Sequence, residues 1–278
     1  MNSQASGRAR RAFLLVAAIL LAGLTVGCSH RLHAPMQPDG WSAQPVVLAD
    51  RFMPDADLDP ATGAPVGDAG HFLYILTESP DWDFSQVSSL ISSICWRPGA
   101  HSWLVLESPE DRLECGQTGD FGRDKPRYYR GVMQRIRDGH PDPIGYLWHT
   151  MTDGQLQIGQ PNRPPTFVWR MPITQRRYRL IHDRLTQRNY DLFGVRSDNC
   201  TDLVAEIAEL AGIHLIHRIH LTVPPKARLL GRTVRLWTDP QYRILEFSTP
   251  EVLEADLRQL ARLGIGSDAT KWYRTVKR

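Results

Sequence analysis

Four short stretches in this chain, three of them mostly apolar, follow the pattern of β-strands. They cover residues 71–77, 101–107, 112–118 and 166–171. The second and third are separated by Ser108-Pro109-Glu110-Asp111, a turn-forming sequence, so we expect them to pair as a hairpin.

Four other stretches carry apolar side chains at the spacing of amphipathic helices. They cover residues 84–96, 173–188, 200–211 and 250–263. Ser248-Thr249 precedes the last stretch as a helix cap, and Gly212 and Gly264 follow the last two where a left-handed residue commonly ends a helix. Helices packed on a small antiparallel sheet form an α+β fold, which is the fold class we predict.

The N-terminus has the pattern of an exported protein. Arg8, Arg10 and Arg11 precede an apolar run over residues 12–26, which is short and rich in small residues for a membrane span. The run ends just before Cys28, and this arrangement resembles a bacterial lipoprotein signal. The resemblance implies cleavage after residue 27 and acyl chains such as palmitate on Cys28. With Ser29 following, it also implies an anchor at the periplasmic face of the outer membrane.

Charge and composition indicate how the chain is organised into segments. The net charge of +3 belongs to residues 1–27, because the remainder has thirty basic and thirty acidic side chains. A mature chain without excess positive charge gives no reason to expect a nucleic-acid partner. Residues 28–69, rich in proline, aspartate, alanine and glycine, are predicted to be a flexible tether. We expect the folded domain over residues 70–212, with an insertion at 119–165, and a C-terminal extension at 213–278 packing on it.

Two residues of this domain suggest nucleophilic chemistry. Cys200 lies in Asn199-Cys200-Thr201-Asp202, at the start of a predicted helix, where the helix dipole favours the thiolate. His101 opens the strand that begins the hairpin and could serve as the base. Together they predict a cysteine hydrolase, although a cysteine before an apolar helix is also a common buried core residue.

A strand that begins with histidine, a hairpin partner that carries a polar residue, and Asn-Cys at the start of a later helix resemble a known superfamily. It is the circularly permuted, NlpC-type branch of the papain-like cysteine peptidases, which includes the YaeF/YiiX group of lipoproteins. The resemblance covers residues 70–212. It implies that Cys200 is the nucleophile, that His101 is the general base, and that a polar residue on the second hairpin strand orients His101.

The identity of the orienting residue is open. Glu114 lies about where the superfamily has this residue, and we expect it first. A two-residue turn at Glu110-Asp111 would instead put Asp120 across from His101. Glu107 shares a face with His101 but lies about 20 Å farther along the strand, at ~3.3 Å per residue.

The remaining cysteines and histidines suggest less specific roles. Cys95 and Cys115 are candidates for a disulfide in the oxidising periplasm, or for two buried thiols. In a strand, the spacing of His214, His217 and His220 would turn the middle side chain to the opposite face, so we predict no metal site and no cofactor.

The insertion begins with a basic and aromatic run that is either a solvated face or a lid over an anionic substrate or lipid headgroup. The run contains Arg123, Lys125, Arg127, Tyr128, Tyr129, Arg130, Arg135 and Arg137. Location and resemblance predict a thiol hydrolase that cleaves an amide bond in peptidoglycan stem peptides. The alternatives are a lipid or thioester acyl hydrolase or transferase, and a non-catalytic lipoprotein that binds the cell envelope.

Overall fold

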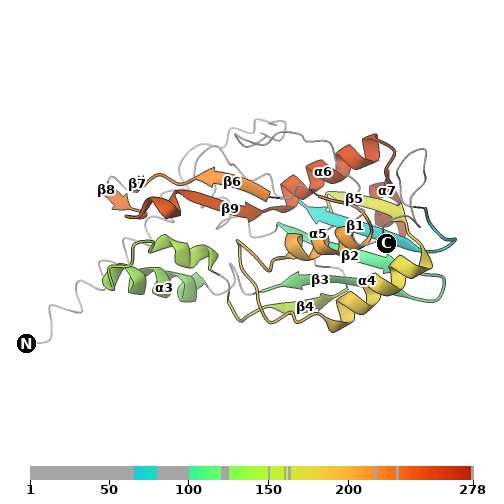
Figure 1. Ribbon diagram of the computed structural model, residues 1–278, viewed down its shortest axis with the longest axis horizontal. Coiled ribbons are helices and arrows are strands. Elements are labelled where there is room, and N and C mark those ends of the chain that lie inside the picture. The colour runs from blue at the N-terminus through green and yellow to red at the C-terminus, as the bar shows by residue number, and fades with distance from the viewer. Residues whose placement is uncertain are drawn as a thin grey trace, which may run out of the picture.

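A computed structural model describes residues 66–79, 100–119, 125–149, 151–159, 161, 164–215, 218–229 and 232–276 (Figure 1). Its main feature is a six-stranded sheet in the order β10–β5–β1–β2–β3–β4, in which every neighbouring pair is antiparallel. The strands are β1 (Phe72–Glu78), β2 (His101–Glu107), β3 (Arg112–Thr118), β4 (Gln155–Ile158), β5 (Phe167–Pro172) and β10 (Ser267–Asp268).

The two faces of this sheet are covered by different helices, because side chains alternate along each strand. On one face Leu73 and Leu104 pack against α4 (Gln175–Gln187), α5 (Cys200–Leu210) and α6 (Pro250–Arg262). On the other face Tyr74 and Trp103 pack with Tyr273 of α7 (Thr270–Val276). The central strands are therefore buried on both sides, which explains their nearly continuous apolar sequences.

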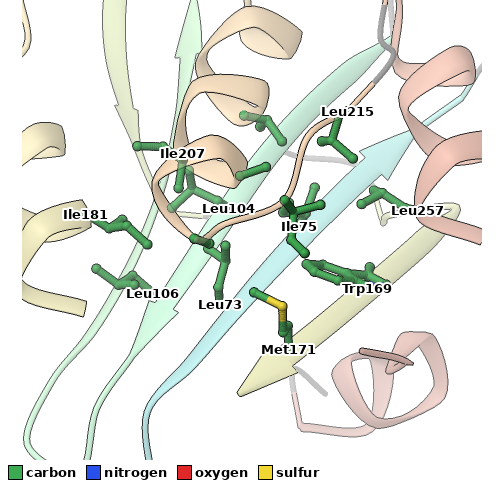
Figure 2. Close-up of a cluster of buried hydrophobic side chains, with 14 of the residues drawn as sticks. Leu73, Ile75, Leu104, Leu106, Trp169, Met171, Ile181, Ile207, Leu215 and Leu257 are labelled. Atoms are coloured by element: carbon green, nitrogen blue, oxygen red, sulfur yellow. The ribbon is translucent and has the colours of Figure 1, made fainter. Parts of the chain in front are cut away.

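The larger core lies under the three helices of the first face (Figure 2). Ile181, Ile207 and Leu257 come from one helix each and converge on Leu104 and Ile75 of the sheet. Full burial of one such side chain stabilises the fold by roughly 1.5–3 kcal/mol, so this cluster holds α5 firmly on β2.

A second group of elements lies beside the six-stranded sheet, at the end of the molecule where Figure 1 draws α3, β7 and β8. It contains α3 (Lys125–Arg137), the 3₁₀ helix η2 (Ile144–Trp148), β6 (Arg218–Thr222), β7 (Lys226–Leu229), β8 (Arg232–Arg235), η3 (Pro240–Arg243) and β9 (Ile244–Ser248). Trp148 of η2 shares a buried cluster with Ile219 of β6 and Phe247 of β9. The insertion and the C-terminal region therefore fold against each other.

The C-terminal end of α5 is stabilised by a buried arginine. Arg177 of α4 is fully buried, and its Nη1 donates to the Leu210 carbonyl at 3.0 Å. Gly212 has φ +87°, and a Cβ there would lie 2.8 Å from the same Nη1. A cation at this end also interacts favourably with the helix dipole, so Arg177 helps to fix the helix that carries Cys200.

Most of the predicted elements are confirmed. The α+β class, the hairpin and the helices after Asn199 and Thr249 are present, and the strand and helix boundaries agree within two residues where both are described. Gly212 and Gly264 both have positive φ, as their capping positions predict. The helix expected at residues 84–96, the signal and the tether lie outside the described residues. No helix in the described part of the chain has the length and apolarity needed to cross a membrane.

Candidate active site

The turn before α5 is held by a capping box. The Asn199 side chain accepts from the N–H groups of Thr201 and Asp202 at 2.9 and 3.0 Å, and Asp202 accepts from the Asn199 N–H at 3.3 Å. Asp198 has φ +60°, a left-handed conformation that aspartate tolerates better than most residues. These contacts fix Cys200 as the first residue of the helix, where the dipole favours a negative charge.

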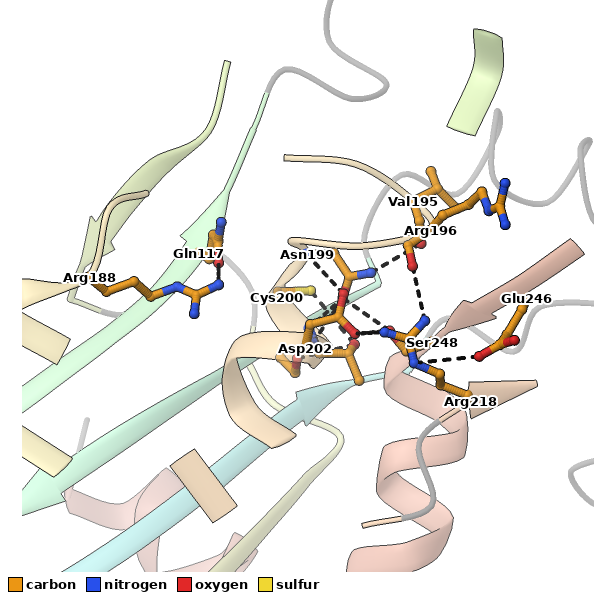
Figure 3. A network of polar contacts seen from close by, with 12 residues as sticks. Gln117, Arg188, Val195, Arg196, Asn199, Cys200, Asp202, Arg218, Glu246 and Ser248 are labelled. Carbon is orange, nitrogen blue, oxygen red and sulfur yellow. Dashed lines mark hydrogen bonds and ion pairs between the residues drawn. The ribbon is translucent and has the colours of Figure 1, made fainter. Parts of the chain in front are cut away.

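Side chains from the C-terminal region reinforce this turn (Figure 3). The Ser248 hydroxyl of β9 donates to Asn199 Oδ1 and to Asp202 Oδ1, both at 3.2 Å. Arg218 of β6 donates to Asp202 Oδ1 and to the Arg196 carbonyl, both at 3.1 Å. Residues 213–278 therefore contribute directly to the position of the candidate nucleophile.

The thiol of Cys200 and the imidazole of His101 lie close enough for each to shift the pKa of the other. Burial alone would raise the pKa of Cys200, but the hydrogen bond and positive charge of His101, together with hydrogen bonds from Ser102, lower it. Burial likewise acts to lower the pKa of His101, and its contacts with Cys200 outweigh burial and raise it. Opposite shifts of this kind favour a thiolate beside an imidazolium.

Gln157 is a residue that the sequence interpretation missed. Its interaction with His101 contributes to the raised pKa of the imidazole, as a hydrogen-bond acceptor would. Its Nε2 donates to the Gly159 carbonyl at 3.0 Å, and none of the described hydrogen bonds occupies its Oε1. His101 Nε2 is buried and has no partner at ordinary hydrogen-bond geometry in the described part of the chain. Gln157 Oε1 is therefore the acceptor best suited to orient the imidazole.

Gly116 explains how β4 can reach His101 across β3. It pairs with Gln157, and a Cβ on Gly116 would lie 3.3 Å from His101 Nε2 and 2.9 Å from Trp103 Cβ. The missing side chain leaves room for the imidazole. The sequence does contain this signal, a glycine inside a strand, which often marks close approach of another group.

Glu114, the orienting residue expected first, contacts other groups. Its Oε1 accepts from Trp103 Nε1 at 3.0 Å and from the Tyr273 hydroxyl. The Trp103 ring stacks on His101, with ring centroids 5.7 Å apart and planes 14° from parallel. Glu114 and Tyr273 thus hold the tryptophan that supports one face of the imidazole.

The turn predicted at residues 108–111 is confirmed, and the alternative of a two-residue turn at Glu110-Asp111 is wrong by one residue. The Ser108 N–H donates to the Asp111 carbonyl at 2.8 Å, so Pro109 and Glu110 are the central residues. The register pairs Leu104 with Cys115, and its continuation puts Thr118, not Asp120, across from His101. Asp120 itself lies outside the described residues. Glu107, the third alternative, accepts from Tyr74 and pairs with Arg112.

Cys115 is a free thiol, and because Cys95 lies outside the described residues the disulfide suggested between them is not tested. The alternation along β3 turns Cys115 into the core under α5, where it is fully buried. Burial raises its pKa to about 12, which makes it a poor nucleophile. Cys95 and the lipidation candidate Cys28 lie outside the described residues.

The backbone at Cys200 offers a donor for a developing negative charge. Asn199 occupies the next two N–H groups of the helix, and none of the described hydrogen bonds uses the N–H of Cys200. A free N–H at the helix start, next to the thiolate, is the arrangement that an oxyanion hole requires.

A polar cavity of about 540 Å³ lies beside this turn. Arg196 and Ser197 line it from the residues that precede Cys200. The α3–η2 region and the β6–η3–β9 region supply the other walls, which are mostly charged or polar. Its volume is within the range of about 300–1,000 Å³ that is usual for ligand sites.

No protein-family model, curated protein or solved structure matches this chain. We therefore infer the function from the geometry of the site.

Proposed function

We propose that this chain is a thiol hydrolase that cleaves an amide bond, with Cys200 as nucleophile and His101 as general base. The observation that carries the proposal is the contact between Cys200, at the start of α5, and His101, at the start of β2, which lowers the pKa of the thiol and raises that of the imidazole. A buried structural cysteine would have the opposite shift, as Cys115 has.

In the acylation step the thiolate attacks the carbonyl carbon of the amide. The Cys200 N–H stabilises the negative oxygen of the tetrahedral intermediate. The imidazolium of His101 donates its proton to the leaving nitrogen, the C–N bond breaks, and an amine leaves a thioester on Cys200.

In the deacylation step the neutral imidazole takes a proton from water. The hydroxide attacks the thioester, the C–S bond breaks, and the carboxylic acid product leaves. The proton on His101 then restores the thiolate–imidazolium pair. Gln157 acts throughout as a positioning residue, because its contact is to His101 and not to the reacting atoms.

The fold we propose is the circularly permuted papain-like fold of the NlpC-type hydrolases. Three features support it: the antiparallel sheet, a histidine at the start of β2, and a later helix that begins with the cysteine. The polar residue that orients the histidine differs from our first expectation, since Gln157 on β4 takes this role in place of Glu114 on β3.

The substrate class we propose is the stem peptide of peptidoglycan. The polar lining of the neighbouring cavity suits a peptide and offers little apolar surface to an acyl chain. The lipoprotein-like sequence at residues 1–28 would anchor the chain at the periplasmic face of the outer membrane, close to that substrate. Cys28→Ala should release the chain from membranes and leave the activity of detergent-free protein unchanged.

The direct test is hydrolysis of purified muropeptides, followed by mass spectrometry, with phospholipid vesicles assayed in parallel. We expect new amine and carboxylate ends in the peptides, and no such products with Cys200→Ser. Thr201→Ser is a suitable control, because it keeps the hydroxyl next to the thiol. Equal hydrolysis by Cys200→Ser would contradict the proposal, and cleavage of lipid alone would contradict the substrate class.

A further inference from the structure

The cavity beside the nucleophile turn contains more positive than negative groups that are available to a ligand. Its lining includes Arg135, Arg196 and Arg218, with His140 and His149, against two carboxylates, Asp142 and Glu246. The contacts of each charged group decide how much of this charge is already neutralised.

The two carboxylates already have partners. Asp142 Oδ1 accepts from the Gly145 N–H at 3.0 Å, and burial raises the pKa of this carboxyl. Glu246 lies 3.8 Å from Arg218 and 3.9 Å from His220. Neither carboxylate is therefore well suited to attract a cationic ligand.

The three arginines differ in their contacts. Arg218 is bound to Asp202 and to a backbone carbonyl, and Arg135 donates to the Asp142 carbonyl at 3.2 Å while it lies over the Tyr146 ring. The charge of the Arg196 guanidinium acts on the Asp142 carboxyl, but this side chain has no hydrogen bond or ion pair within the described part of the chain. Figure 3 shows it pointing away from the capping network. Arg196 is thus the cation of this cavity that can bind an anion at the smallest cost.

The backbone that lines the cavity lies close to Cys200 along the chain. Ser197, which lines the cavity, lies three residues before Cys200. At ~3.8 Å between successive Cα atoms, their Cα atoms are at most roughly 11 Å apart. An extended peptide covers that distance in about three residues.

We propose that this cavity binds a carboxylate of the peptide substrate through Arg196, within about three residues of the bond that Cys200 cleaves. The inference rests on the proposed function, from which it takes the peptide substrate. It adds a requirement to that function: a free carboxylate near the scissile amide is needed for tight binding. A guanidinium binds a carboxylate with two parallel hydrogen bonds, which gives orientation as well as affinity.

The test measures binding without turnover, by isothermal titration of the full chain carrying Cys200→Ala. The probes are the peptide Ala-Ala-Glu and its analogue Ala-Ala-Gln amide, which lacks both carboxylates. We expect the acidic peptide to bind at least about tenfold more tightly, and Arg196→Gln to remove this difference. Arg137→Gln, on the exposed side of α3 and outside the cavity lining, is the matched control and should retain the preference.

Three outcomes would overturn the inference. They are equal affinity for the two peptides, an unchanged preference in Arg196→Gln, and displacement of the acidic peptide by inorganic phosphate or glycerol phosphate at concentrations where acetate has no effect. The last would identify a phosphate site. Failure of the proposed hydrolysis would be recognised in a separate measurement. That measurement is the thiol reactivity of Cys200 in the chain that retains Arg196, and it does not depend on how the peptides bind.

Discussion

Gly116→Ala tests the claim that the imidazole of His101 occupies the space of a missing side chain. The added Cβ would lie 2.9 Å from Trp103 Cβ and 3.3 Å from His101 Nε2. The first distance is too short for carbon atoms, and Trp103 Cβ is fixed by the backbone, so the strands or the imidazole must move.

Two opposing contributions decide how much Gly116→Ala changes the free energy of unfolding. Overpacking a buried site costs about 1–3 kcal/mol, and replacing glycine by alanine in a strand returns roughly 0.5–1 kcal/mol. We therefore expect a net loss of about 1–2 kcal/mol in the free energy of unfolding. Weaker pairing with His101 should raise the Cys200 pKa, because that contact is what lowers it. A displacement of about 1 Å would lower kcat by roughly a hundredfold.

The assay combines urea unfolding with the pH dependence of thiol alkylation. Gly139→Ala is the matched control, because Gly139 has φ +67° and no atom near the position of a Cβ. It should lose about 1–2 kcal/mol through backbone strain and leave the Cys200 pKa unchanged. An unchanged thiol pKa in Gly116→Ala, or an equal shift in both variants, would refute the reasoning.

The other predictions concern support for the helix and for the imidazole. Arg177→Met should lower the free energy of unfolding by about 2–4 kcal/mol, because it leaves the Leu210 carbonyl unsatisfied and removes a cation from the end of α5. Urea unfolding measures this loss, and a value below about 0.5 kcal/mol would contradict the prediction. Gln157→Ala should lower the pKa of His101 by removing a hydrogen bond that raises it, which nuclear magnetic resonance titration of the imidazole can measure. Glu114→Gln keeps an acceptor for the tryptophan and should change that pKa less than Gln157→Ala does; the reverse order would make Glu114 the orienting residue.

The sequence predicted the elements whose signals are local. The α5 helix has its cap at Asn199, its apolar face and its terminal glycine within a few residues of one another, so its boundaries could be predicted closely. Cys200 could be proposed from the same local pattern. His101 could be found because it opens a short, β-rich apolar run that a turn sequence follows.

The parts that could not be predicted depend on register between distant segments. The hairpin turn is set by the Ser108 hydroxyl, which accepts from the N–H groups of Glu110 and Asp111, with Pro109 in the first central position. A change of one residue in the turn centre moves the partner of His101 by two positions. Gln157 approaches His101 only because β4 pairs with β3, and β4 is a short, mostly exposed strand within the insertion.

The most direct test of the account is the rate of iodoacetamide labelling of Cys200, with the site assigned by mass spectrometry, from about pH 5 to about pH 9. Because the thiol pKa is lowered, the labelling rate should rise with pH and reach its plateau at a pH well below the free-thiol pKa of about 8.5. In His101→Ala the midpoint of this rise should move to higher pH, toward the free-thiol value. An ordinary thiol profile in the unmodified chain, or the same profile in His101→Ala, would contradict an activated nucleophile at this site.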